Sequence, residues 1–335
     1  MADESFATLP AEQRQTAHQA INSVLGAAAA ATVRPMTGGV SGAFVFLVEA
    51  NGRRFVLRIE GPASPLRNPH QYLSMRIAAE EGIAPRLHYL DINERIVMMD
   101  FIEDRPLEAY PDGAQGLARA IGAMVKKLQT APLFPSFVHY PDIVGRLWTH
   151  VCKTGLFADG LLDDASRHLV QIRETYAPQE EQSVSSHNDV LPRNVLFDGK
   201  RLWLIDWESA YRNDPLVDLA TALDNFAPSP DLEEVLLLAW LGHEPDDLLR
   251  NRLALVRALT RLYYAGVLFS ASALAPRARP DHSLLAPTSA EFARAIGDGR
   301  LLAGTRETGH VLGKMYLASF LSGAVPPGLP PMYMR

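Results

Sequence analysis

A chain of 335 residues, 47% of them hydrophobic and 21% charged, has an ordinary globular composition and enough length for about two domains or lobes. The net charge of −6, with lysines and arginines scattered, argues against a nucleic-acid partner, because phosphate backbones are bound by clustered basic residues. The single cysteine, Cys152, excludes an internal disulfide and a thiolate cluster for zinc. No uncharged apolar run reaches the roughly 20 residues that cross a bilayer, and the first residues lack the pattern of a secretory signal, so we expect a cytoplasmic protein without a membrane partner.

The first hundred residues alternate between helical and β-rich patterns. Residues 10–31 are rich in helix formers and predict a first helix. Two β-rich runs in "FVFLVEANGRRFVLRIEG" meet at Asn51-Gly52, which is typical of a tight β-hairpin. A second helix is expected over residues 69–82, and "APRLHYLDINERIVMMDFIED" predicts another pair of strands. This part of the chain is therefore expected to form a small antiparallel sheet with one or two helices.

The rest of the chain is mainly helical in pattern. Helices are predicted over residues 114–130, 141–155, 162–176, 231–241 and 248–275. One β-rich interruption, "NVLFD" and "LWLIDW" around Asp198-Gly199, predicts a second hairpin. The predicted fold class is α+β with two lobes, a small N-terminal lobe (1–102) and a large helical lobe (109–335), which are joined by a hinge (103–108).

The second hairpin lies in the stretch "SSHNDVLPRNVLFDGKRLWLIDWESA", which gathers polar groups among apolar strand formers. Asp189 and Asn194 stand five residues apart in the loop before the hairpin, and the hairpin returns the chain so that Asp206 can come near both. One carboxylate can accept a proton from a hydroxyl, while a carboxamide oxygen and a second carboxylate suit the hard ion Mg²⁺. This division of labour is typical of phosphoryl transfer.

The segments "HNDVLPRN" and "LIDWESAYRNDPLVDLA" resemble the catalytic core of the aminoglycoside phosphotransferase and choline kinase family, which are small-molecule kinases with the bilobal protein-kinase fold. The resemblance extends from about residue 34 to about residue 275. It implies ATP as the phosphoryl donor, Asp189 as catalytic base, Asn194 and Asp206 as Mg²⁺ ligands, and His187 and Asp218 as residues that brace the loop. A small-molecule kinase is the leading hypothesis.

The nucleotide side of the site shows one departure from the family pattern. "TGGVSGAFVFLV" resembles the family's nucleotide loop, with Gly38, Gly39 and Ser41 over the phosphates, although such a segment alone is more often a simple turn. Arg58 stands where these kinases carry the basic residue that reaches the α- and β-phosphates. Kinases usually hold that residue with a helix glutamate, and the matching position here is Gln71, whose carbonyl can accept one donor of Arg58.

"IVMMDFIED" resembles the hinge that joins the two lobes of these kinases. The resemblance implies that the Asp100 carbonyl and the Ile102 N–H contact adenine, with Met98 or Met99 lining the pocket. From local sequence alone, an edge strand running into a loop is an equally good interpretation.

The acceptor is less well defined by the sequence. Residues 185–225 hold seven acidic side chains against four basic ones, which favours a cationic or hydroxyl-rich molecule such as a choline- or ethanolamine-like amino alcohol or an aminoglycoside. Glu208, two residues after Asp206 in "IDWE", resembles the pattern of the choline kinases and is a candidate substrate residue. Aromatic faces suit a quaternary ammonium group, so Trp207 and Tyr211 are further candidates. Arg193 is expected to contact phosphate or to offset the local acidity. Core packing is predicted for the remaining aromatic residues at helical spacing, which are Trp148, Trp240, Tyr263 and Tyr264.

Two other hypotheses remain open at this point. A nucleotide-binding pseudokinase without turnover is one, because Gln71 replaces the usual glutamate. The other is a metal hydrolase that uses His187, Asp189 and Asp206. The hydrolase is disfavoured because no further His/Asp cluster has ligand spacing.

Overall fold

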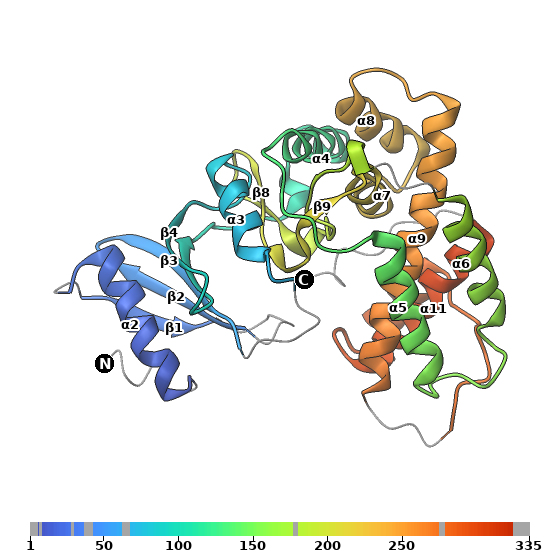
Figure 1. Cartoon of the computed structure of the whole chain (residues 1–335), viewed down its shortest axis with the longest axis horizontal. Coiled ribbons are helices and arrows are strands. Elements are labelled where there is room, and N and C mark those ends of the chain that lie inside the picture. The colour runs from blue at the N-terminus through green and yellow to red at the C-terminus, as the bar shows by residue number, and fades with distance from the viewer. Residues whose placement is uncertain are drawn as a thin grey trace.

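The computed structural model describes residues 6, 9–27, 30–36, 43–61, 68–176, 180–274 and 279–323. Within these residues the chain forms a small sheet-containing lobe and a larger helical lobe (Figure 1). The predicted α+β architecture is therefore present. The predicted phosphate-loop residues Gly38, Gly39 and Ser41 lie outside the described residues.

The small lobe contains one antiparallel sheet whose strands follow the order β1-β2-β3-β5-β4. The strands are β1 (Thr32–Pro35), β2 (Phe44–Ala50), β3 (Arg53–Ile59), β4 (Leu87–Asp91) and β5 (Ile96–Asp100). The predicted hairpin joins β2 to β3, and both turn residues, Asn51 and Gly52, have positive φ angles of 51° and 72°. Two consecutive positive φ angles give the turn whose twist matches that of the paired strands.

The sheet has an apolar face covered by helix α2 (Ala11–Leu25), which appears in front of the strands in Figure 1. Because successive residues of a strand point to opposite faces, Phe55, Leu57 and Ile59 of β3 are buried in the core beneath α2. Arg58, between Leu57 and Ile59, therefore points from the opposite face. The alternation along β3 thus directs one arginine towards the larger lobe.

Helix α3 (Gln71–Glu80) connects the small lobe to the large one. The Asn68 Nδ2 and the Ser74 hydroxyl both donate to the Ala210 carbonyl, at 2.7 and 2.9 Å. The side chains of Tyr72 and Met75 belong to the hydrophobic core of the large lobe. The helix is therefore fixed to the segment that follows the second hairpin.

The large lobe is built from helices, five of which lie at the predicted places. The helices are α4 (Gly113–Gln129), α5 (Tyr140–Lys153), α6 (Asp163–Thr175), α7 (Pro215–Phe226), α8 (Pro230–Leu241), α9 (Asp247–Ala273), α10 (Ser289–Gly297) and α11 (Arg306–Ser322). Among the described residues, α9 alone is long and apolar enough to cross a membrane, but 56% of its most apolar window is buried inside the protein. It packs against α5, α7 and α11 (Figure 1), as the central helix of a core does.

Short strands frame the loop that carries the polar cluster. The predicted hairpin consists of β7 (Val195–Phe197) and β8 (Leu202–Leu204), and β6 (Val184–Ser186) pairs with β9 (Tyr211–Asn213). The Arg105 N–H donates to the Phe197 carbonyl at 2.8 Å, so the segment predicted as the hinge is attached to this hairpin. Gly199 has a φ angle of 92°, which favours glycine, and a Cβ atom there would lie 2.7 Å from the Arg105 guanidinium carbon, so that a larger residue would displace this side chain.

Candidate active site

Asp189 lies in the loop between β6 and β7, and donors hold both of its carboxylate oxygens. Oδ2 accepts hydrogen bonds from Asn194 Nδ2 at 2.7 Å and from Arg193 at 3.0 Å. Oδ1 accepts one from the Tyr264 hydroxyl at 2.9 Å. The carboxylate is 16% exposed, so it is fixed in orientation and still accessible to a small molecule.

Asp218, on the first turn of α7, braces the loop from below. This fully buried carboxylate accepts the backbone N–H groups of His187 at 2.8 Å and Asn188 at 2.6 Å. Burial raises the pKa of Asp218 to about 6, although the His187 and Asn188 donors act in the opposite direction. The predicted bracing geometry is present, and the charge is tolerated because two N–H groups face it.

Further contacts of His187 and Asn188 fix the backbone of the loop. The His187 Nε2 pairs with the Ile205 carbonyl at 2.9 Å, and the His187 ring packs edge-on against the Trp207 indole at 4.7 Å between centroids. Asn188, which the sequence did not single out, has a positive φ of 62° and donates to the Ser209 carbonyl at 2.8 Å. The loop is thereby tied to both ends of the segment that carries Asp206.

Asn194 and Asp206 both carry oxygen atoms, and the Ile205 N–H, which donates to the Asn194 carbonyl at 2.9 Å, brings the two residues to the same part of the site. The amide Nδ2 of Asn194 donates to the carboxylate and the carbonyl of Asp189, and no described residue donates to its Oδ1. Asp206 follows β8 with a φ of 67°, and its carboxylate is 37% exposed. An amide oxygen and a carboxylate are hard donors of the kind that Mg²⁺ binds, so this pair fits a magnesium ion.

Arg58 reaches this site from β3 and contacts three carboxylates. Its guanidinium is 3.1 Å from Asp206 Oδ1, 3.1 Å from Glu60 Oε1, and in contact with Glu208. Its pKa is raised because these three carboxylates outweigh the effect of burial, which alone would lower it. Arg58 is therefore a fixed positive charge at the centre of the polar cluster.

The predicted hydrogen bond from Arg58 to the Gln71 side-chain carbonyl is not formed among the described residues. Gln71 is 4% exposed, and its Oε1 has no hydrogen-bond partner among the described residues. The residue that accompanies Arg58 within the small lobe is Glu60. The contact of Glu60 with Arg58 was not predicted from the sequence, because the kinase pattern places the carboxylate partner of this basic residue on a helix.

Tyr264 was expected to be a core residue, and its ring is indeed buried with an exposed fraction of 9%. Its hydroxyl nevertheless donates to Asp189, so it is also part of the site. Burial and the neighbouring Asp189 charge raise the pKa of Tyr264 well above its usual value, which keeps the donor proton on the phenol. Helical spacing in α9 correctly indicated burial but could not reveal a hydroxyl directed at another segment.

A small pocket of about 90 Å³ lies beside this catalytic loop and is mainly aromatic. Four aromatic rings line it, those of Phe137, Tyr140, Tyr211 and Tyr263. The rest of the wall consists of the Glu208 carboxylate, the polar side chains of Asn68, Asn188 and Ser209, and the apolar side chain of Ile143. The rings contact one another in pairs, with centroids 5.6 Å apart for Phe137 and Tyr211 and 5.8 Å apart for Tyr140 and Tyr263. The pocket therefore combines aromatic faces with a negative charge.

Of the predicted substrate residues, two line this pocket and one does not. Glu208 and Tyr211 are part of its wall. Trp207 is 1% exposed and packs between His187 and Phe134, so its ring is a core element and is not available to a bound molecule. Trp207 and Glu208 are adjacent in sequence, but the short 3₁₀ turn at Trp207–Ser209 directs the Trp207 side chain into the core and the Glu208 side chain towards the pocket.

The connection between the lobes contains Asp100 and Ile102, the residues predicted to contact adenine. Ile102 follows the end of β5, and no described residue accepts a hydrogen bond from its N–H. The Asp100 side chain pairs with His88 at 2.7 Å. Met98 is buried under α2, whereas Met99 packs on the opposite face against the core of the large lobe. Met99 is thus the methionine on the side of the site.

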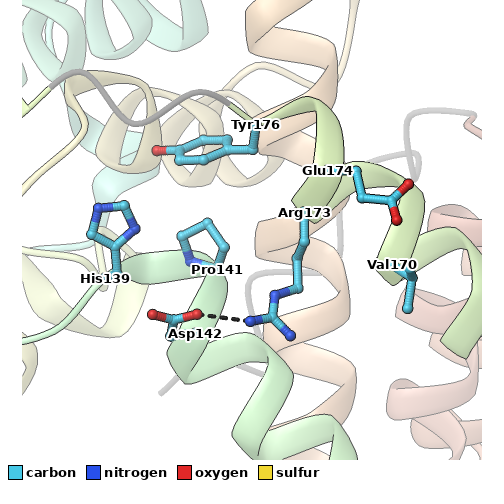
Figure 2. A pocket seen from close by; sticks show the side chains of 7 residues that line it. All are labelled: His139, Pro141, Asp142, Val170, Arg173, Glu174 and Tyr176. Atoms are coloured by element: carbon cyan, nitrogen blue, oxygen red, sulfur yellow. Dashed lines mark hydrogen bonds and ion pairs between the residues drawn. The ribbon is translucent and has the colours of Figure 1, made fainter.

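A larger surface hollow of about 370 Å³ lies elsewhere, between the start of α5 and the end of α6. Figure 2 shows its lining residues, His139, Pro141, Asp142, Val170, Arg173, Glu174 and Tyr176. Arg173 and Asp142 pair across it at 2.8 Å. None of the predicted site residues lines this hollow, so the chemistry is expected at the smaller aromatic pocket.

Comparison with known proteins agrees with this geometry. A model of the phosphotransferase enzyme family matches residues 32–253, a range that includes the loop, Asp206 and Asp218. The chain belongs to this family. It is 43% identical over 197 residues to protein LicA of Haemophilus influenzae, a match that covers 57% of this chain and 73% of that protein. The predicted enzyme class, a small-molecule kinase, is confirmed, and nothing favours the pseudokinase or the hydrolase.

Solved structures of similar fold support the two-lobed architecture. A choline/ethanolamine kinase family protein from Mesorhizobium loti has a TM-score of 0.62 at 21% identity, covering 90% of this chain and 99% of that one. A structure of LicA in complex with AMP has a TM-score of 0.60 at 14% identity, covering 91% of this chain and 98% of that one. The predicted kinase-like α+β fold of this phosphotransferase is therefore confirmed.

Proposed function

We propose that this phosphotransferase transfers the γ-phosphoryl group of ATP to the hydroxyl of a small amino alcohol whose ammonium group is choline- or ethanolamine-like. The observation that carries the proposal is the aromatic pocket beside Asp189, with Glu208 in its wall. Aromatic faces attract ammonium groups, most strongly when the site is shielded from water. A carboxylate in the same wall adds charge complementarity.

The size of the pocket supports an amino alcohol over an aminoglycoside. A space of about 90 Å³ suits a single ammonium headgroup better than several amino-sugar rings. Asn188 lines this pocket and is followed directly by Asp189, so the hydroxyl of an amino alcohol, two carbons from the ammonium nitrogen, would lie near the carboxylate. The name of the Mesorhizobium loti relative, a choline/ethanolamine kinase family protein, agrees with this assignment.

In the proposed reaction Asp189 is the general base. It accepts the proton of the acceptor hydroxyl while that oxygen bonds to the γ-phosphorus, and the bond from the γ-phosphorus to the bridging oxygen of ADP breaks. The donors Asn194, Arg193 and Tyr264 keep the carboxylate oriented, so it does not need to reorganise during the transfer. Arg193 also offsets the charge of Asp189.

The nucleotide side of the proposal uses Asn194 and Asp206 as Mg²⁺ ligands. Both present hard oxygen donors, and Asn194 Oδ1 receives no hydrogen bond from a described residue. A bound Mg²⁺ would neutralise charge on the phosphates. Arg58 is assigned to the α- and β-phosphates, the Asp100 carbonyl and the Ile102 N–H to adenine, and Gly38, Gly39 and Ser41 to the phosphate loop.

An acceptor panel tests the proposal. Purified protein is incubated with Mg²⁺ and ATP plus choline, ethanolamine, kanamycin or glucose, and ADP release is measured against a reaction without acceptor. We expect choline or ethanolamine to stimulate ADP release at least tenfold more than kanamycin or glucose, since about 1.4 kcal/mol of selective binding gives that ratio. Stimulation by kanamycin alone would contradict the acceptor class but not the reaction.

A further inference from the structure

Glu60 is a buried carboxylate that no predicted role explains. Its side chain is 1% exposed, and its Oε1 lies 3.1 Å from the Arg58 guanidinium. Glu60 follows the end of β3 two residues after Arg58, and the Glu60 N–H donates to the Arg95 carbonyl at 3.0 Å. Side chains two residues apart on an extended segment share a face, so the backbone itself directs Glu60 and Arg58 the same way.

The three carboxylates around Arg58 differ in exposure. The side chains of Asp206 and Glu208 are 37% and 30% exposed, and both come from the large lobe. This inference rests on the proposed function, in which Asp206 binds Mg²⁺ and Glu208 contacts the ammonium group of the acceptor. Glu60 faces neither ligand because it is buried within the small lobe. It is thus the carboxylate that can stay with Arg58 when both substrates are bound.

Gln71 does not provide an alternative. It occupies the position that matches the helix glutamate of the kinase pattern, but it is neutral and makes no hydrogen bond to Arg58 among the contacts of the described residues. A buried guanidinium needs a fixed anionic partner, because an unpaired charge in that environment is costly. Glu60 meets this requirement from the same strand.

We propose that Glu60 is the positioning residue for Arg58, holding the guanidinium towards the phosphates after Asp206 and Glu208 have engaged their ligands. The role belongs in other kinases to a helix carboxylate. In this protein the positioning carboxylate, Glu60, directly follows the strand that carries Arg58. Movement of α3 is then not required to align Arg58.

Calorimetric titration of Mg-ADP tests this assignment without relying on turnover. Glu60→Gln is expected to weaken Mg-ADP binding about tenfold, because a charged hydrogen bond that positions Arg58 is lost. Glu60→Asp, which retains the charge on a shorter side chain, should recover part of the affinity. Glu49→Gln is the matched control, since Glu49 pairs with Arg34 on the same sheet but is remote from Arg58, and it should bind Mg-ADP normally.

A double-mutant cycle separates positioning from a general structural effect. In an Arg58→Met background, Glu60→Gln should change the Mg-ADP dissociation constant by less than about twofold. That double variant also leaves no unpaired buried charge, so it remains informative if Glu60→Gln alone fails to fold. An equal loss of affinity in both backgrounds, or unchanged affinity in Glu60→Gln with a loss in Gln71→Ala, would overturn the proposal.

Steady-state kinetics give a second readout. The KM for ATP should rise in Glu60→Gln while the KM for the acceptor stays the same, whereas general destabilisation of the fold would not separate the two constants. If the unmodified protein phosphorylates an amino alcohol and these constants do not separate, the Glu60 inference fails and the proposed function stands. If the unmodified protein phosphorylates no member of the panel, the proposed function fails first.

Discussion

The two sides of the active site are stabilised in different ways. Asp189 is held by Asn194, Arg193 and Tyr264, all of which belong to the large lobe and can keep these contacts when substrates bind. Arg58, in contrast, contacts two carboxylates of the opposite lobe that the proposed ligands also need. On the proposed function, the base is therefore preorganised, whereas the arginine assigned to the phosphates would exchange partners and keep only Glu60.

The largest effect is expected from removing the base itself. Asp189→Asn should lower kcat by about 10²- to 10⁴-fold, the usual contribution of a general base, while Mg-ADP still binds. Asp164→Asn, on the exposed surface of α6, is the control and should leave kcat unchanged. Near-normal ADP release by Asp189→Asn would contradict the assignment of Asp189 as the general base.

The brace beneath the loop gives the next largest effect. Asp218→Asn replaces an acceptor of two backbone N–H groups by an amide that can accept through one oxygen only, so we expect a loss of unfolding free energy of about 1–3 kcal/mol and a lower kcat. Chemical denaturation together with kinetics measures both. Unchanged kcat in a destabilised protein would show that the brace serves only the fold.

The raised pKa of Asp218 predicts how this stability loss depends on pH. Because burial raises the pKa of Asp218 from 3.8 to about 6, the folded chain binds more protons than the unfolded chain between these values. Its contribution to the unfolding free energy is complete at low pH and is lost as pH rises through about 6. The stability difference between the unmodified protein and Asp218→Asn should therefore be about 1 kcal/mol larger at pH 5 than at pH 7.5.

Denaturant titrations at the two pH values check this expectation. A difference that grows from pH 5 to pH 7.5 would mean that Asp218 is ionised more readily in the folded chain than in the unfolded one. Burial would then not be the dominant influence on this carboxylate.

The aromatic pocket should affect acceptor binding more than catalysis. Tyr263→Ala removes one ring of the pocket and should raise the KM for choline about tenfold with a smaller change in kcat, since a shielded cation–π contact is worth about 1–2 kcal/mol. Tyr263→Phe keeps the ring and should change that KM by less than about twofold. Equal KM values for both variants would place the ammonium group elsewhere.

The smallest effect is expected at Tyr264. Tyr264→Phe removes one of the donors to Asp189 and leaves the others, so kcat should fall about fivefold, which corresponds to about 1 kcal/mol. Tyr110→Phe is a matched control because its ring packs on Phe197 away from Asp189. A loss as large as that of Asp189→Asn would show that Tyr264 does more than orient the base.

Much of this arrangement could be predicted from the sequence because it is encoded locally. Asn51-Gly52 and Asp198-Gly199 specify their hairpins, and the spacing of Asp189 and Asn194 specifies a loop that folds back on itself. The short strands β1, β6 and β9 were not predicted, because three or four residues give too little periodicity and their pairing partners are remote in sequence.

Contacts between distant segments account for what the sequence did not reveal. Tyr264 is 75 residues from Asp189, and the contact of Arg58 with Asp206 spans 148 residues. Trp207 was assigned to the substrate because it is aromatic and next to Asp206, but a 3₁₀ turn directs it into the core. Residue type does not determine which side chain faces the pocket, because tertiary packing decides it.

Phosphorus NMR of a reaction containing Mg²⁺, ATP and choline tests the central claim most directly. With the unmodified protein we expect a new phosphomonoester signal that grows in equal amount to ADP, and with Asp189→Asn we expect no such signal. Inorganic phosphate as the sole product, or a phosphomonoester formed equally well by Asp189→Asn, would contradict this claim.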